Sequence, residues 1–357
     1  MFTQTSPRGF ARRVLRSPLV SVLTGPHGVD AYTELVDRAW TDREARATIV
    51  TARRTTPRSV TLTLRPNAPC ARVCSEFRAG GHVSVSVEID GRRHTRTYSP
   101  ANAEGSDLIE LTVGRHDGGR VSTFLNDFAH PGMVVGIGTP GATFELDRTA
   151  QRMLFVSGGS GITPVMSMVR TLRAEGSTAD ISFVHYARTP EDAVYARELA
   201  AMPGVRVLHG YTRSGSGGDL DGHVSAEHLR LAQPDPDAVY VCGPPQLADA
   251  VLAQHPGAQT ESFVPPSFDT AESSGGRVRF ADSGVDVEDD GRPLLEQAEA
   301  AGLNPESGCR MGICHSCTRR KTTGAVKNLI SGVVSTAAGE DIQICVTAPV
   351  GGVELAL

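Results

Sequence analysis

The chain has 357 residues, a formal net charge of −5 and a hydrophobic content of 39%. This length allows two or three domains of ordinary size, and the composition is that of a globular protein. Nearly all positive charge is arginine, because lysine occurs only at Lys321 and Lys327. The negative balance argues against a nucleic-acid-binding protein, which needs a basic face.

Residues 1–43 form an N-terminal extension in which arginines alternate with apolar residues. Its apolar run is too short to span a bilayer. Two interpretations stay open: a basic amphipathic segment on a membrane surface, or a helical extension packed on the next domain. Asp30 is expected to cap a helix over residues 31–40. Without an export signal, the odd number of cysteines favours a reducing cytoplasm, with peripheral membrane contact as the alternative.

Short runs of alternating apolar and polar residues, separated by turns, fill residues 44–148. SVTLTLRP and HVSVSVEI are typical, and the pattern predicts an antiparallel β-barrel. One strand carries Arg96-Thr97-Tyr98-Ser99, in which Arg96 and Tyr98 share a face and suit a phosphate and an aromatic ring. Taken alone, the motif fits an ordinary half-buried strand equally well.

A glycine turn at Gly119 is predicted to enter a helix through Val121 and Ser122. The N–H groups of such a turn and the Ser122 hydroxyl suit a phosphate. An ordinary capped helix start explains the same residues, so this motif depends on its neighbours for a functional interpretation.

The pattern changes again over residues 149–264, where buried strands alternate with helices. This alternation predicts a parallel α/β sheet. The first strand leads into a glycine-rich loop before a helix, which is the context of a dinucleotide pyrophosphate site. The loop departs from G-x-G-x-x-G, so a plain turn is the alternative. Its candidate ligands are Gly158, Gly159, Gly161, Thr163 and Pro164.

Another strand of this region, AVYV, ends at Cys242 and Gly243. Ligands bind at the carboxyl ends of the strands in open α/β sheets, so these two residues are candidate ligands. A buried core thiol is the alternative for Cys242, because cysteine is often buried.

Residues 265–275 are rich in Pro, Ser and Gly and are expected to form a linker. In residues 276–357, Cys309, Cys314 and Cys317 follow C-x4-C-x2-C, and Cys345 comes after 27 further residues. This is the ligand spacing of a plant-type [2Fe–2S] cluster. Disulfides need an oxidising compartment, zinc sites usually show other spacings, and a Rieske centre needs two histidine ligands. His315 is therefore expected to be a loop residue.

Charge is unevenly placed along the chain. Residues 265–357 hold 13 acidic and 8 basic residues, whereas residues 1–66 hold 5 acidic and 11 basic ones. An acidic cluster domain predicts docking on a basic partner surface.

The motifs R-x-Y-S, GGSGITP and CGPP, in this order, resemble the ferredoxin–NADP reductase superfamily over roughly residues 44–264. The part from residue 276 resembles plant-type ferredoxins. With its N-terminal extension and the stretch CRMGICHSC, the chain resembles actinobacterial reductases that are electron-transfer partners of stearoyl-CoA desaturase. The implied fold is multidomain, with an antiparallel β-barrel flavin domain, an α/β parallel-sheet NAD(P) domain and an α+β (β-grasp) ferredoxin domain.

The resemblance implies three cofactors: FAD, a [2Fe–2S] cluster and NADPH, with NADH as the alternative. The implied flavin ligands are Arg96, Thr97, Tyr98, Ser99, Gly119, Val121, Ser122 and Phe263. The implied nucleotide ligands are Gly158, Gly159, Gly161, Thr163, Pro164, Arg188, Arg213, Cys242 and Gly243. The implied catalytic residues are Ser99, Cys242 and Glu261, and the implied metal ligands are Cys309, Cys314, Cys317 and Cys345. NADPH is favoured because Arg188 and Arg213 suit a 2′-phosphate.

The implied reaction is hydride transfer from NAD(P)H to FAD, followed by release of single electrons through the cluster to a partner protein. The expected partner is an oxygenase or desaturase, and the resemblance favours a fatty acyl-CoA desaturase. A soluble haem-thiolate or Rieske oxygenase is the alternative partner. A redox-sensing protein with little turnover is the second class of function.

Overall fold

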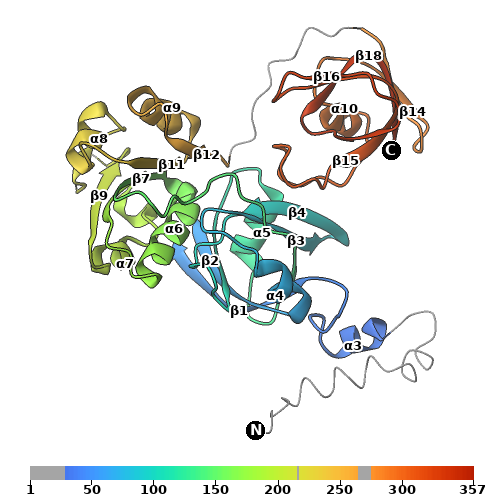
Figure 1. The fold of residues 1–357 in the computed structure, drawn as a ribbon. Helices are drawn as coiled ribbons and strands as arrows, with labels where there is room; N and C mark the ends of the chain where they lie inside the picture. Colours follow the sequence, from blue (N-terminus) through green and yellow to red (C-terminus); the bar gives the residue numbers. More distant parts are fainter. Residues whose placement is uncertain (1–28, 215–216, 264–274) are drawn as a thin grey trace.

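The computed structural model describes residues 29–214, 217–263 and 275–357. Figure 1 shows three bodies, each built on one six-stranded sheet, with the C-terminal body (orange to red) at the upper right. The basic segment within residues 1–28 and most of the expected linker lie outside the described residues.

The first sheet is antiparallel throughout, with strand order β4-β3-β6-β1-β2-β5. Strand β3 buries Val83, Val85 and Val87 while Ser84 and Ser86 stay partly exposed, which is the alternation that predicted it. Helix α5 contacts β2, β4 and β5 and so covers the gap between the two edge strands. The elements are β1 Arg46–Thr56, β2 Ser59–Pro66, α4 Ala68–Cys74, β3 Val83–Ile89, β4 Arg92–Tyr98, β5 Ile109–Gly114, α5 Arg120–Phe128 and β6 Val134–Ile137.

The second sheet is parallel throughout, with strand order β10-β9-β8-β7-β11-β12. The chain runs outward from β7 in both directions, so the sheet reverses its winding between β7 and β11, where ligands bind in such folds. Helices α6 and α7 pack on one face and α8 and α9 on the other. The elements are β7 Arg152–Gly158, η2 Gly159–Gly161, α6 Ile162–Ala174, β8 Asp180–Ala187, η3 Pro190–Asp192, α7 Ala196–Ala201, β9 Val205–Tyr211, β10 Leu220–Asp221, α8 Ala226–Ala232, β11 Ala238–Cys242, α9 Pro245–Gln254 and β12 Gln259–Glu261.

A buried polar network holds these two domains together. The Tyr195 hydroxyl lies 2.6 Å from Thr112 Oγ1 and donates to the Glu110 carboxylate at 2.9 Å. Arg170 donates to Glu110 at 2.8 Å and to Glu198 at 2.7 Å, with its guanidinium over the Tyr195 ring. Arg170 is largely buried, and its burial is tolerated because its charge is paired and hydrogen-bonded. The network fixes α6 and α7 against the barrel.

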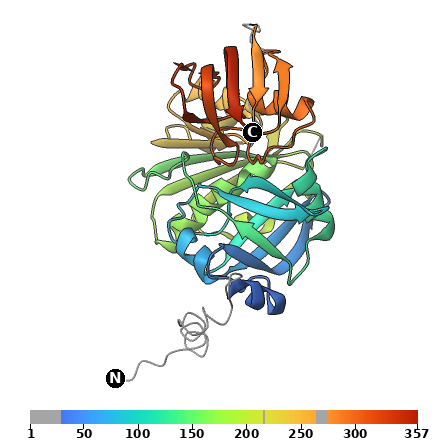
Figure 2. The ribbon, with the colours of Figure 1, turned by 90° about the vertical axis from the view of Figure 1, so that its right-hand side faces the viewer.

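The third sheet is mixed, with order β14-β13-β18-β15-β16 and β17 paired to β15. Only β13 and β18 run parallel among its described pairs, and α10 packs on the sheet to form the core. This is the α+β arrangement expected for the last domain. The elements are β13 Arg277–Phe280, β14 Val285–Glu288, α10 Leu294–Ala300, β15 Thr318–Asn328, β16 Val334–Ser335, β17 Glu340–Gln343 and β18 Thr347–Ala356. Figure 2 shows this domain stacked above the other two.

The N-terminal helix differs from the prediction. Helix α3 spans Asp30–Val36, so it ends four residues early, and Val29 rather than Asp30 precedes it as the N-cap. The Asp30 carboxylate instead accepts hydrogen bonds from Thr41 Oγ1 at 3.1 Å and from the Asp42 N–H at 3.2 Å. It therefore ties the following loop to the helix. Within the described part of the chain, every helix is too short or too polar to cross a bilayer.

Candidate functional site

Two loops meet at the switch point of the parallel sheet. A Cβ added to Gly161 would lie 2.2 Å from the Cys242 carbonyl oxygen, and one added to Gly158 would lie 2.9 Å from side-chain atoms of Leu247 and Pro244. Only glycine allows this close packing. Gly159 adopts a left-handed φ of +55° and faces open space. The loop thus leaves room above the N-terminus of the 13-residue helix α6, where Thr163 and Pro164 form the first turn. This geometry fits the pyrophosphate of a dinucleotide.

Residues from two domains converge beside these loops. Cys242 and Glu261 are direct neighbours on β11 and β12, with Cys242 Sγ 3.9 Å from Glu261 Oε2. Burial raises the pKa of Glu261 to about 8, an effect that its contacts with Ser99 and Cys242 partly offset. Burial likewise raises the pKa of the Cys242 thiol. Both groups are therefore neutral at pH 7 in this state. The three residues predicted to be catalytic are brought together, with Ser99 supplied by the barrel and the other two by the parallel sheet.

The end of β4 presents unsatisfied polar groups. The Ser99 hydroxyl is buried and makes no hydrogen bond of good geometry within the described residues, although it lies close enough to the Glu261 carboxyl to lower that pKa. Thr97 Oγ1 is also buried without a hydrogen-bond partner there. Tyr98 follows on the same strand, and burial raises its pKa. Buried polar atoms are normally satisfied, so these hydroxyls fit a site completed by the polar edge of a flavin.

Helix α5 begins directly after Gly119, which is its N-cap. The Ser122 hydroxyl accepts from the His116 N–H and donates to the Gly119 carbonyl, both at 3.2 Å. The Ser122 hydroxyl is therefore engaged in hydrogen bonds within the turn. Val121 is buried in the barrel core. The N–H groups of the first helical turn stay directed along the axis of this nine-residue helix, which fits a phosphate.

Two exposed arginines stand at the outer carboxyl edge of the parallel sheet. Arg188 follows β8 and Arg213 follows β9, and the Arg213 N–H donates to the Arg188 carbonyl at 2.9 Å. The two side chains therefore start from adjacent backbone positions.

Phe263, past the end of β12, packs against the core between α6 and the sheet.

The four cysteines of the C-terminal domain form two pairs. Cys309 interacts with Cys314, and Cys317 interacts with Cys345. In each pair the contact between the two thiols raises the pKa of one and lowers the pKa of the other. No three metal-binding side chains of the described residues converge on one point. Two thiol pairs suit two irons, each of which takes two thiolates, better than they suit a single tetrahedral ion.

The backbone around these thiols is shaped to stabilise negative charge. The Cys309 N–H points at Cys314 Sγ at 3.1 Å, and the Met311 N–H points at Cys309 Sγ at 3.3 Å. Arg310 and His315 adopt left-handed φ values of 60° and 56°, which turn the loop tightly. The His315 ring is exposed and contacts Gln343 at 3.1 Å, as expected of a loop residue. These N–H···S contacts fit an iron–sulfur cluster.

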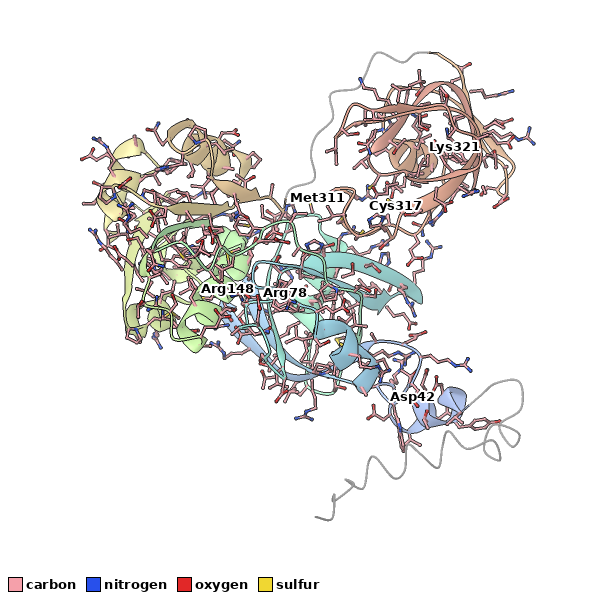
Figure 3. The ribbon with its side chains drawn as sticks, in the orientation of Figure 1. Asp42, Arg78, Arg148, Met311, Cys317 and Lys321 are labelled. Atoms are coloured by element: carbon pink, nitrogen blue, oxygen red, sulfur yellow. The ribbon has the colours of Figure 1, made fainter. Side chains whose placement is uncertain are left out.

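The cluster loop touches the barrel. Arg96 Nη1 donates to the Gly308 carbonyl at 3.2 Å, and Gly308 directly precedes Cys309. In Figure 3, Met311 and Cys317 lie on the side of the C-terminal domain that faces the barrel. A groove of about 1100 Å³ runs beside this contact, lined by Cys314 and His315 on one side and by barrel residues such as His82 on the other. The candidate flavin strand and the candidate cluster are thus in direct contact.

A polar row at the switch point includes two residues, Ser157 and His185, that the sequence did not single out. Ser157 Oγ lies 2.8 Å from His185 Nδ1, and both side chains are fully buried. The strand register aligns Glu261, Cys242, Ser157 and His185 on four neighbouring strands. Burial lowers the pKa of His185 to about 3, so the ring is neutral. The signal in the sequence for Ser157 and His185 was a polar residue near the carboxyl end of a largely apolar strand.

Three family models match the chain in succession. They are an oxidoreductase FAD-binding domain over residues 60–146, an oxidoreductase NAD-binding domain over residues 155–253, and a 2Fe-2S iron-sulfur cluster binding domain over residues 278–350. The three matches coincide with the three sheets described above.

Relatives with all three parts are also found. The chain is 33% identical to an NADPH oxidoreductase of Mycobacterium tuberculosis, with 92% of this chain and 88% of that protein covered. It is 30% identical to a glycine betaine monooxygenase reductase subunit of Pseudomonas aeruginosa, with 70% and 78% covered. The solved structure of phthalate dioxygenase reductase superposes with a TM-score of 0.60 at 26% identity, covering 88% of this chain and 98% of that one. The chain therefore belongs to the family of ferredoxin reductase-type oxidoreductases that join an FAD-binding, an NAD-binding and a [2Fe–2S] domain in one polypeptide, and it transfers electrons from NAD(P)H through FAD to the iron–sulfur cluster.

Proposed function

We propose that this chain is the NADPH-dependent reductase component of an oxygenase system and that a separate oxygenase protein takes electrons from its cluster. The observation that carries the proposal is the continuous arrangement of three sites. Glu261, beside Cys242 at the nucleotide loops, interacts with Ser99, which follows β4, and Arg96 on β4 contacts the cluster loop. The loops for the hydride donor, the flavin strand and the cluster loop are thus linked by successive contacts.

The barrel residues are proposed to hold FAD. Arg96 and Tyr98 would hold the flavin from one face of β4, and the α5 N-terminus would hold its phosphates. Bound FAD accepts a hydride and releases electrons singly, which is the chemistry it supplies to such a site. Ser99 would donate its otherwise unsatisfied hydroxyl to the ring. Glu261, neutral below about pH 8, would hold a proton next to the same atoms without adding charge.

The loops of the parallel sheet are proposed to hold the nucleotide. Gly158, Gly159 and Gly161 would face its pyrophosphate, and Cys242 and Gly243 would lie by its nicotinamide. The fully buried Cys242 excludes water from that position. Arg188 and Arg213, side by side at the sheet edge, would bind a 2′-phosphate, which is present in NADPH and absent from NADH.

An apolar loop beside the cluster supports a protein as the electron acceptor. Ile330, Val333 and Val334 are 59%, 62% and 51% exposed. Ile330 lies against the cluster loop, since a Cβ on Gly312 would come within 3.4 Å of its Cδ1. Exposed apolar side chains in a group are typical of interaction sites. Residues 265–357 also carry a net negative charge. Together these features favour a partner whose docking surface has an apolar patch surrounded by basic residues.

The names of relatives support an oxygenase as this partner. Two of them are reductase subunits of glycine betaine monooxygenase and of phthalate 4,5-dioxygenase. A fatty acyl-CoA desaturase is the second candidate. It is favoured by the resemblance that rests on the N-terminal extension and the stretch CRMGICHSC.

The experiment is NADPH oxidation by the purified protein with either washed host membranes or the soluble fraction, under oxygen and with stearoyl-CoA. Stimulation by the soluble fraction alone supports an oxygenase that is not membrane-bound. Stimulation by membranes with an unsaturated acyl product supports the desaturase. Reduction of cytochrome c without stimulation by either fraction would count against both partners while leaving the reductase chemistry intact.

A further inference from the structure

Helix α4 of the barrel carries two thiols that the electron-transfer chemistry does not use. Cys70 and Cys74 lie one helical turn apart, and their sulfur atoms are 3.7 Å apart. Cys70 is fully buried in the barrel core, whereas Cys74 is half-buried. One thiol is therefore open to small reagents and the other stands directly behind it.

We propose that Cys70 and Cys74 are a peroxide-reactive dithiol, in which hydrogen peroxide oxidises Cys74 and Cys70 then closes an intramolecular disulfide. Hydrogen peroxide is the two-electron reduction product of oxygen, and a reductase that works under air is exposed to it. The site is separate from the three cofactor sites described above.

The reaction balances in two steps. The Cys74 sulfur attacks peroxide, an S–O bond forms, the O–O bond breaks, and one water leaves a sulfenic acid. The Cys70 sulfur then attacks the Cys74 sulfur, the S–S bond forms, the S–O bond breaks, and a second water leaves. Two thiols and one hydrogen peroxide thus give one disulfide and two waters.

The helix geometry places the thiols close but not at bonding distance. A disulfide needs an S–S length of about 2.05 Å and Cβ atoms about 3.5–4.5 Å apart, whereas Cβ atoms four residues apart on a helix lie about 5–6 Å apart. The last turn of α4 must therefore open. Cys74 is the final helical residue, so this opening breaks few backbone hydrogen bonds.

The rest of the helix is anchored, which confines the movement to Cys74. The Asn67 carboxamide accepts from the Cys70 N–H at 2.9 Å and donates to the carbonyls of Ala39 and Glu44. Cys70 is thereby held at the base of the helix. The contact with Cys70 lowers the pKa of Cys74, which favours the exposed thiol as the attacking one.

The sequence makes the test direct, because Arg72 lies between the two cysteines. Tryptic cleavage after Arg58, Arg72 and Arg78 places Cys70 in residues 59–72 and Cys74 in residues 73–78. The holoprotein is treated with hydrogen peroxide at a dose that leaves its visible cluster spectrum unchanged. The protein is then unfolded in the presence of N-ethylmaleimide, which blocks every free thiol, and the non-reduced digest is examined by mass spectrometry.

The expected result is a linked pair of these two peptides, two hydrogen masses lighter than their sum, that separates after reduction with dithiothreitol. In Cys70→Ser, the sulfenic acid on Cys74 should persist and be trapped by dimedone. Cys74→Ser, at the half-buried position, serves as the control that keeps Cys70 in its reduced form. Recovery of both wild-type peptides singly alkylated, or of Cys74 only as sulfinic acid, would overturn the proposal.

Discussion

Arg96 of the barrel and Gly308 of the cluster loop are joined by a hydrogen bond of 3.2 Å, although 212 residues separate them in the chain. Gly308 directly precedes the candidate cluster ligand Cys309, and Arg96 is on the strand that leads to the candidate flavin residues Tyr98 and Ser99. This contact joins the candidate flavin strand directly to the loop that carries the candidate cluster ligands, as electron transfer within one chain requires.

Replacing Arg96 by Ala should slow transfer from flavin to cluster. A hydrogen bond to a charged group contributes about 1.5–3 kcal/mol, so we expect cytochrome c reduction per bound FAD to fall by about tenfold or more. Ferricyanide, which can take electrons at the flavin, should be reduced at a less affected rate per FAD. Arg92→Ala, on the same strand but exposed, is the matched control. Equal losses per FAD with both acceptors would show that Arg96 acts on the reactivity of the flavin and not on transfer to the cluster.

Cys314→Ser should remove the cluster while leaving the flavin chemistry. Serine supplies no thiolate, so one iron would lose a ligand. Visible absorption from the cluster and cytochrome c reduction should fall to background, whereas ferricyanide reduction by NADPH should continue. Cys74→Ser, a half-buried cysteine far from the cluster in sequence, should retain both activities. Unchanged cytochrome c reduction in Cys314→Ser would exclude the route through the cluster.

Hydride transfer should depend on pH through Glu261. Burial raises the pKa of this carboxyl to about 8, so it is neutral below that pH and ionised above it. A carboxylate beside the flavin opposes the arrival of a hydride, so ferricyanide reduction should decline as pH rises through about 8. Glu261→Gln keeps a neutral group of the same shape and should remove the decline. A profile that is the same in both proteins would assign the titration to another group.

Nucleotide preference should depend on the two arginines at the sheet edge. Arg188→Ala and Arg213→Ala should each raise KM for NADPH by about 10-fold or more, because each loses a charge-assisted hydrogen bond to phosphate. KM for NADH should change little. Arg230→Ala, on the exposed side of α8, is the control. A parallel rise for both nucleotides would indicate a structural effect instead of recognition of the 2′-phosphate.

Periodicity was enough to predict the first two sheets, whereas the third was implied by the resemblance to plant-type ferredoxins. Alternation in β3 predicted a half-buried antiparallel strand, and the continuous apolar runs of β7 and β8 predicted a parallel sheet buried on both faces. The short helices α4, α7 and α8 were not predicted. They have 7, 6 and 7 residues, so each shows less than two turns of periodicity. The helix over residues 31–40 was predicted too long because Asp37 leaves helical geometry.

Spacing along the chain likewise predicted the cysteine loop, but not how distant parts meet. The contact between Arg96 and Gly308 and the one between Ser99 and Glu261 depend on how whole domains pack, which local patterns do not encode. The same holds for Tyr195, whose left-handed φ of 59° places its hydroxyl in the interface between barrel and parallel sheet. The two cysteines of α4 were visible in the sequence, but only the helix brings their sulfurs to 3.7 Å.

The most direct test of internal electron transfer is an anaerobic titration of the purified holoprotein with NADPH, followed by visible absorption and by electron paramagnetic resonance. We expect flavin absorbance to fall and the signal of a reduced [2Fe–2S] cluster to appear in the same samples. Bleaching of the flavin with a cluster that stays oxidised, although dithionite can reduce it, would exclude electron transfer from the flavin to the cluster.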